Sequence, residues 1–139
     1  MTSTVFTIPV PSTSFLDDVK FSRLPRRKCS LKYSYEGEED YSAIFEELIF
    51  DGVESFRCTY YMACSLEMRY AYDKVLNVGL SQWLSEVIDN LSQNNADTKN
   101  LKHLRVYFDD GPCYEFICKS FEVVSEEQKD YLENPNNLV

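Results

Sequence analysis

The stretch HLRVYFDDGPCYEFICKSFEV, residues 103–123, decides the fold. Apolar and polar side chains alternate in its first half, with Leu104, Val106 and Phe108 on one face and His103, Arg105 and Tyr107 on the other. This alternation indicates a strand. The sequence DDGP at 109–112 is typical of a turn, because Asp bonds its own backbone and Gly tolerates positive φ. The stretch therefore predicts an antiparallel hairpin of residues 101–109 with 113–124.

The returning strand has apolar residues on both faces. One face carries Tyr114, Phe116 and Cys118, and the other carries Ile117, Phe121 and Val123. Two interpretations stay open: a β-bulge near residues 118–120, or a strand that is covered on both sides.

Two earlier segments also read as strands. Residues 28–35 alternate cleanly between apolar and polar side chains, and an acidic turn, 36–40, follows them. Asp51-Gly52 is a hairpin signal, so we expect residues 44–50 to pair with 53–61. A helix over 41–49 is the alternative, because Tyr41, Ile44, Phe45, Leu48 and Ile49 also lie at helical spacing.

Two helices are expected between the hairpins. Ser65 can cap a helix over about 66–76, and Ser81 can cap a second one over about 81–92. In the second helix the apolar residues fall at i, i+3, i+4 and i+7, namely Leu84, Val87, Ile88 and Leu91. We expect Trp83 to help seat this helix on the sheet.

Together these segments predict an α+β fold, with a mainly antiparallel sheet of about 4–6 strands and one or two helices on one face. Residues 1–27 are expected to form an extended N-terminal arm, because Pro9 and Pro11 confine any strand there to a sheet edge. Residues 28–125 then form a single domain, and 126–139 form a charged C-terminal tail.

The charge restricts the class of partner. The formal net charge is −9 and the pI is near 4.6, which argues against binding to nucleic acid or to an anionic membrane surface. The charge is uneven, since residues 1–35 carry a net +4 and the remainder −13. The basic arm either docks on the acidic body or forms an exposed handle.

The sequence also favours a cytoplasmic location. The first fifteen residues lack the features of a secretory signal, and no apolar run is long enough to span a membrane. The five cysteines are Cys29, Cys58, Cys64, Cys113 and Cys118. Their odd number and the absence of a CxxC spacing fit a reducing compartment.

One polar row is the candidate binding site. It consists of His103, Arg105, Tyr107, Asp109 and Asp110, at the end of the predicted hairpin. Because His103 is the only histidine, any ordinary serine or cysteine hydrolysis would have to use it. The alternative is an ordinary strand face exposed to solvent. No catalytic residue is assigned.

Other chemistry is not indicated. The cysteine spacings match no zinc site, and with glycine only at 37, 52, 79 and 111 no phosphate-binding loop can be built. The carboxylates of residues 36–40, 46–47 and 109–110 are expected to lie on solvated turns and surfaces. We predict no metal and no cofactor.

Three segments of the chain resemble known proteins. The segments at 103–123, 48–61 (LIFDGVESFRCTYY) and 81–87 (SQWLSEV) resemble a group of small bacterial α+β proteins that are similar to immunity-type domains. The resemblance implies a bacterial protein that neutralises a partner toxin, and it implies no catalytic residue.

Three functions remain open. The first is a non-enzymatic protein-interaction domain, as in an immunity or inhibitor protein, that binds a basic partner. The second is a small-molecule-binding domain or modest enzyme that uses the His103 strand face. The third is a structural homo-oligomer joined through sheet edges.

Overall fold

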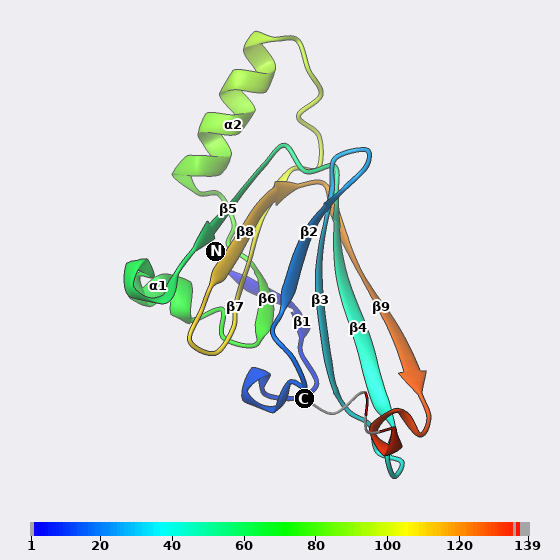
Figure 1. The fold of residues 1–139 in the computed structure, drawn as a ribbon. Coiled ribbons are helices and arrows are strands. Elements are labelled where there is room, and N and C mark those ends of the chain that lie inside the picture. Colours follow the sequence, from blue (N-terminus) through cyan, green and yellow to red (C-terminus); the bar gives the residue numbers. More distant parts are fainter. Residues whose placement is uncertain (1, 135, 137–139) are drawn as a thin grey trace.

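The computed structural model describes residues 2–134 and 136. Its described residues form nine strands in two antiparallel sheets, which pack face to face (Figure 1). The predicted sheet of 4–6 strands is therefore too small, although the predominance of antiparallel strands with two α-helices agrees with the expected class. The aromatic side chains that alternate along the strands need a second apolar layer, and the second sheet provides it.

The first sheet has five strands in the order β1-β6-β7-β8-β5. These strands are β1 (Ser3–Thr7), β5 (Ser55–Thr59), β6 (Lys74–Asn77), β7 (Lys102–Tyr107) and β8 (Cys113–Cys118). The second sheet has four strands in the order β2-β3-β4-β9. They are β2 (Lys20–Leu24), β3 (Lys28–Glu36), β4 (Ala43–Asp51) and β9 (Ser120–Gln128).

The main core lies between the two sheets. Phe50 of β4 stacks on Phe116 of β8, with ring centroids 4.0 Å apart. Both rings are fully buried, and Leu31, Leu48 and Leu104 surround them. Burial of each such side chain contributes about 1.5–3 kcal/mol, so this layer holds the two sheets together.

The predicted strand 113–124 is divided between the two sheets. β8 ends at Cys118, Lys119 connects the sheets, and β9 begins at Ser120. Every residue of β8 is buried, so the interpretation of a strand covered on both sides is confirmed. The apolar faces change near 118–120 because the chain passes from one sheet to the other there.

The predicted hairpin of 44–50 with 53–61 is wrong. β4 pairs with β3 and β9, whereas β5 pairs with β8 in the other sheet. Gly52 does turn the chain, with φ +64, but the turn leads from one sheet to the other. The alternative of a helix over 41–49 is wrong as well, because this segment is a central strand with a neighbour on each side.

The first predicted helix is much shorter than expected. Helix α1 (Leu66–Arg69) is capped by Ser65 as predicted, but the chain then turns and enters β6. Asp73 has φ 55, which is outside the helical region, and Val75 and Leu76 are buried in the first sheet. Strand pairing and burial therefore override the local helical spacing.

The second predicted helix is confirmed, but its predicted packing on one face of the sheet is wrong. Helix α2 (Gln82–Gln93) begins after Ser81, whose hydroxyl accepts a hydrogen bond from the Leu84 amide at 3.1 Å. Figure 1 shows that α2 extends beyond the ends of the strands. Leu84 is the only residue of the helix that is fully buried, so α2 is held mainly at its N-terminus.

The two ends of the chain take part in the fold. The segment expected to be an N-terminal arm supplies β1 and β2 as edge strands and the short helix η1 (Ser12–Ser14) between them. In the turn after β2, Arg27 forms an ion pair with Glu54 at 2.7 Å. The segment expected to be a tail continues β9 to Gln128 and adds the short helix η3 (Tyr131–Glu133). A third short helix, η2 (Tyr61–Ala63), precedes α1.

Candidate functional site

The polar row predicted at the end of the hairpin is divided by the structure. His103, Arg105 and Tyr107 are buried, with exposed fractions of 1%, 8% and 5%. Asp109 and Asp110 lie exposed on the β7–β8 turn. The expectation of a solvent-facing strand is therefore wrong for the first three residues, because they face a second packed layer on the outer side of the first sheet.

Glu115 of β8 is the centre of that layer. Its carboxylate is fully buried and accepts hydrogen bonds from three side chains. His103 Nε2 and Arg105 Nε both lie 2.8 Å from Oε1, and Arg57 Nε lies 3.0 Å from Oε2. A buried carboxylate is tolerated when cations pair with it and donors fill its lone pairs. We call Glu115 and these three partners the Glu115 cluster.

The pKa of Glu115 reflects the balance of these contacts. Burial acts to raise it, because a low dielectric disfavours the charged form. Hydrogen bonds from His103 and Arg105, with the charges of Arg105 and Arg57, outweigh burial and bring the pKa to about 2. The carboxylate is therefore ionised across the physiological pH range.

Helix α2 is attached to the cluster through its capping residue. The Ser81 hydroxyl lies 2.8 Å from His103 Nδ1 and also caps the helix at Leu84. Trp83 meets the His103 ring edge to face, and the Arg57 guanidinium lies over the Trp83 ring, 4.1 Å from its centroid. The predicted role of Trp83 in seating the helix thus agrees with its contacts.

The order hydroxyl, imidazole, carboxylate also occurs in serine hydrolases. In this chain the Ser81 oxygen already accepts the Leu84 amide hydrogen, and two guanidinium groups neutralise Glu115. The imidazole is 1% exposed and both of its nitrogens are engaged. We interpret this arrangement as a structural connection between β7, β8 and α2.

Glu115, Ser81 and Arg57 were not among the predicted site residues. One signal for Glu115 was available, since it is the only charged residue in the apolar run CYEFIC. Ser81 was identified only as a helix cap. Arg57 gave no signal, because its pairing with Glu115 depends on the contact between β5 and β8.

A second carboxylate is also buried, contrary to the expectation of a solvated surface. Glu46 of β4 is 5% exposed and accepts hydrogen bonds from the hydroxyls of Tyr33 and Tyr35. Burial and the neighbouring Glu46 charge raise the pKa of Tyr35 to about 12, so this hydroxyl stays protonated near neutral pH. Tyr33 and Tyr35 belong to the main core, and Tyr33 and Glu46 also line a hollow on the second sheet.

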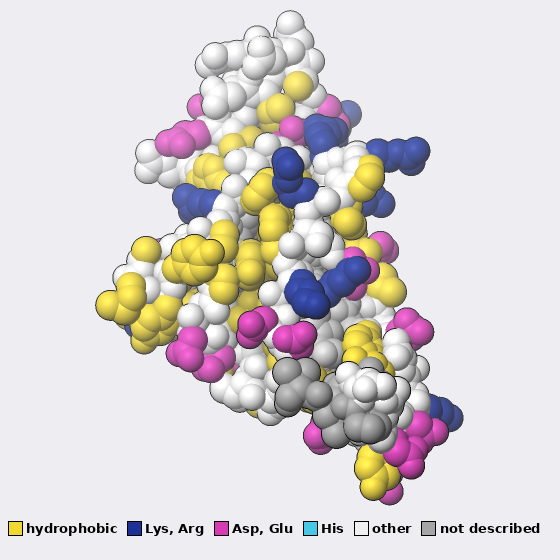
Figure 2. All heavy atoms as spheres, in the orientation of Figure 1, with side chains coloured by type: hydrophobic (Ala, Val, Ile, Leu, Met, Phe, Trp, Pro, Cys, Tyr) yellow, Lys and Arg dark blue, Asp and Glu magenta, His cyan; other side chains and the backbone are white. Residues whose placement is uncertain are grey.

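The segment between β5 and β6 carries an exposed aromatic surface. Six large side chains are at least 40% exposed there: Tyr60, Tyr61, Met62, Leu66, Tyr70 and Tyr72. We call these six residues the tyrosine surface. Figure 2 shows hydrophobic side chains gathered on the part of the molecule where α1 lies in Figure 1.

A small separate core holds the tyrosine surface in place. Its buried members are Cys64, Ala71, Leu76, Tyr107 and Cys113. The β7–β8 turn adds a close backbone contact, since a side chain at Gly111 would lie 3.0 Å from the Tyr61 amide nitrogen. The segment is therefore anchored on the first sheet, and its outer side chains have no cover among the described residues.

Acidic residues border the tyrosine surface. The Tyr72 hydroxyl donates a hydrogen bond to Asp109 at 3.4 Å, which places this carboxylate at its edge. Beside Tyr60 lies a hollow of 320 Å³ that is lined by Asp17, Asp18 and Asp109, with no Lys or Arg in its lining. Two of the predicted candidates, Asp109 and its neighbour Asp110, thus lie next to an exposed aromatic surface.

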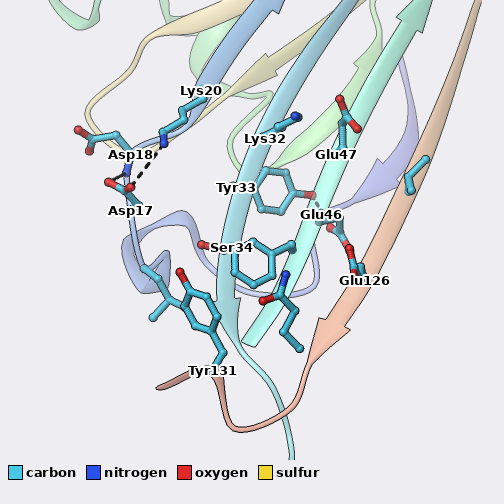
Figure 3. A pocket seen from close by; sticks show the side chains of 14 residues that line it. Asp17, Asp18, Lys20, Lys32, Tyr33, Ser34, Glu46, Glu47, Glu126 and Tyr131 are labelled. Atoms are coloured by element: carbon cyan, nitrogen blue, oxygen red, sulfur yellow. Dashed lines mark hydrogen bonds and ion pairs between the residues drawn. The ribbon is translucent and has the colours of Figure 1, made fainter. Parts of the chain in front are cut away.

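A second hollow, of 430 Å³, lies on the second sheet (Figure 3). Its basic side chains, Lys20 and Lys32, come from β2 and β3, and its acidic ones include Glu47 and Glu126 from β4 and β9. The hollow is lined by five carboxylates and two lysines, so its charge favours a cationic ligand over an anionic one.

All five cysteines are free thiols. No group of three or more metal-binding side chains is found among residues 2–134 and 136. Cys58 is exposed and the other four cysteines are buried, as expected for core residues. Burial raises the pKa of Cys113 and Cys118, which keeps both thiols protonated.

None of the helices in the described part of the chain is long and apolar enough to cross a membrane. Comparison with protein-family models, with curated proteins and with solved structures finds no match to this chain.

Proposed function

We propose that the chain is a non-enzymatic protein-interaction domain that binds a basic partner protein through the tyrosine surface. The observation that carries this proposal is the exposure of six large apolar side chains within residues 60–72. A contiguous exposed apolar patch on a folded protein marks an interaction site. Tyr and Met are also enriched at protein interfaces, where Tyr supplies apolar area and a hydroxyl together.

The anchoring of the segment that bears this surface supports the same function. The tyrosines stand on a buried core that includes residues of β6, β7 and β8. A segment whose backbone is already anchored loses less entropy when a partner binds, so more of the contact energy appears as affinity.

The charges around the surface support a basic partner. Glu67 lies within the segment, and Asp109 and Asp110 lie on the adjoining turn. The one cation of the segment, Arg69, lies over the Tyr61 ring at 4.7 Å from its centroid. With a net charge of −9 on the chain, opposite charges would steer a basic protein toward this surface.

An immunity or inhibitor protein is the form of this function that we favour. The resemblance of three sequence segments to immunity-type domains suggests it, and a basic toxin such as a nuclease would match the acidic surface. The proposal includes no catalytic step.

The test is a comparative capture experiment. The wild-type chain and the triple variant Tyr60→Ser, Met62→Ser, Tyr70→Ser are immobilised, and lysate of the source organism is passed over both at low salt. Leu80→Ser is the matched control, because Leu80 is 78% exposed but lies outside the tyrosine surface. Circular dichroism verifies that all three proteins are folded.

We expect a basic protein that is retained by the wild type and by Leu80→Ser, is lost with the triple variant, and is released as salt rises. A purified partner should then bind the wild type at least about tenfold more tightly than the triple variant. Equal retention by the triple variant and the control would overturn the proposed surface.

A further inference from the structure

We propose that copies of this chain associate edge to edge, with strand β9 of one copy adding to strand β2 of the next. These strands form the two edges of the second sheet, so each has a hydrogen-bonded neighbour on one side only. The outer backbone groups of an edge strand are able to pair with a strand from another chain. The tyrosine surface lies on the other sheet, so this association is independent of the function proposed above.

The edge at β9 is acidic. Glu122, Glu126 and Glu127 are exposed along a strand of nine residues. Within residues 2–134 and 136, none of these three carboxylates has an ion-pair partner. Their charges are therefore available to a second molecule.

The edge at β2 is basic. Lys20 and Arg23 are exposed, and Arg26 continues the positive charge into the following turn. Lys20 has one ion pair, a long contact of 3.9 Å with the exposed Asp17, whereas Arg23 has no ion pair with any described residue. A long exposed contact of this kind is weak, so Lys20 can exchange Asp17 for another carboxylate.

The division of charge extends across the sheet. Figure 3 shows Lys20 and Lys32 on β2 and β3, and Glu47 and Glu126 on β4 and β9. Asp17 and Asp18 lie beside Lys20 before β2, but the charged side chains of the strand itself are basic. Each copy therefore presents a positive strand and a negative strand, which attract when two copies lie side by side in the same orientation.

The strand directions allow this arrangement. Each neighbouring pair in the order β2-β3-β4-β9 is antiparallel, so β2 and β9 run in opposite directions. A second copy in the same orientation thus presents an antiparallel partner to β9. Placing its Ser22 opposite Val124 brings Lys20 opposite Glu126 and pairs all five residues of β2 with β9.

The same charges disfavour the other pairings. Two β9 strands would place glutamates side by side, and two β2 strands would do the same with cations. The favoured contact is therefore heterologous, between different edges, and it repeats from copy to copy.

The first measurement is the mass of the wild-type chain in solution, by analytical ultracentrifugation. At about 0.05 M salt we expect the mass to rise with protein concentration, and at about 0.5 M salt we expect the association to weaken about tenfold or more. A monomer at every concentration tested in low salt would overturn the inference.

Charge reversal identifies the edges. One variant carries Glu122→Lys and Glu126→Lys on β9, and a second carries Lys20→Glu and Arg23→Glu on β2. Each variant alone has two edges of like charge and should be monomeric. An equal mixture should associate again, because each β9 then meets a β2 of opposite charge.

A matched control changes the charge elsewhere. Glu86→Lys with Asp89→Lys on the exposed face of α2 alters the net charge as much as the β9 variant does, but leaves both edges intact. We expect this control to associate as a single species. Association of either edge variant alone, or a mixture that stays monomeric, would contradict pairing of β2 with β9.

Discussion

Strands β8 and β9 are separated in sequence by one residue, Lys119, but their surroundings are opposite. Every residue of β8 is buried, because the main core covers one face and the layer around Glu115 covers the other. β9 is a sheet edge on which most residues are exposed. The two strands therefore show the same residue type, glutamate, in the interior and at the surface of one protein.

The buried and the exposed carboxylates differ in the hydrogen-bond partners that they require. Glu115 requires three hydrogen-bond donors, two of them guanidinium groups, because water is excluded from it. The glutamates of β9 are solvated and contribute little to folding, but their charge remains available to a partner. In this chain, the buried charge of Glu115 connects β5, β7 and β8, whereas the exposed carboxylates of β9 have no ion-pair partner among the described residues.

The largest expected effect comes from removing the buried carboxylate. Glu115→Ala should lower the free energy of unfolding by about 3–5 kcal/mol, because it leaves Arg57 and Arg105 without their counterion. Glu127→Ala on β9 is the control and should change stability by about 0.5 kcal/mol or less. Urea denaturation followed by Trp83 fluorescence measures both, and equal losses would remove the contrast between the strands.

The next effect is a dependence on pH. The pKa of Glu115 is about 2 in the folded chain against an ordinary value of 4.5, so its stabilisation is complete above about pH 4.5 and is lost as the pH falls toward 2. The difference corresponds to about 3 kcal/mol.

The control for this effect is Glu115→Gln, which has no group to titrate at this position. Denaturation of both proteins at a series of pH values should show a stability gap that is constant above pH 4.5 and narrows below it. A gap that does not change between about pH 4.5 and 2 would contradict the ionised state of Glu115.

The smallest effect tests whether the Glu115 cluster stabilises helix α2 through Ser81. Ser81→Ala removes both the cap of α2 and the bond to His103, and should cost about 1–2 kcal/mol. Ser65→Ala removes only the cap of the short, exposed helix α1 and should cost less. Hydrogen exchange should report faster opening of α2 in Ser81→Ala, and equal costs for the two serines would argue that the bond to His103 adds nothing.

Local patterns predicted the elements whose formation depends on near neighbours in sequence. The strand at 28–35, the hairpin of β7 with β8, the helix after Ser81 and both serine caps followed from periodicity and capping rules. Alternation also placed Tyr114, Phe116 and Cys118 on one face, and these three residues share the main core. Within a strand or helix the side-chain directions repeat regularly, so the sequence alone determines them.

The same local rules could not predict which distant segments pair with each other. Nothing local shows that residues 44–50 join β3 and β9 while 55–59 join β8, because both partners satisfy the same pattern of apolar residues. The short α1 is a similar case, because pairing of β6 in the first sheet ends the helix that the spacing of apolar residues predicted. The candidate row was predicted by residue type, but its division into buried and exposed parts was not.

The sequence by itself determined a folded, acidic, mainly antiparallel domain with one capped amphipathic helix, and it identified the turn that bears Asp109 and Asp110. The tertiary structure alone decided that Glu115 is buried among cations, that the tyrosines of residues 60–72 are exposed, and that opposite charges lie on the two edges of one sheet. The physical reason is that burial and charge pairing depend on which distant segments meet, whereas periodicity and capping depend on a few consecutive residues.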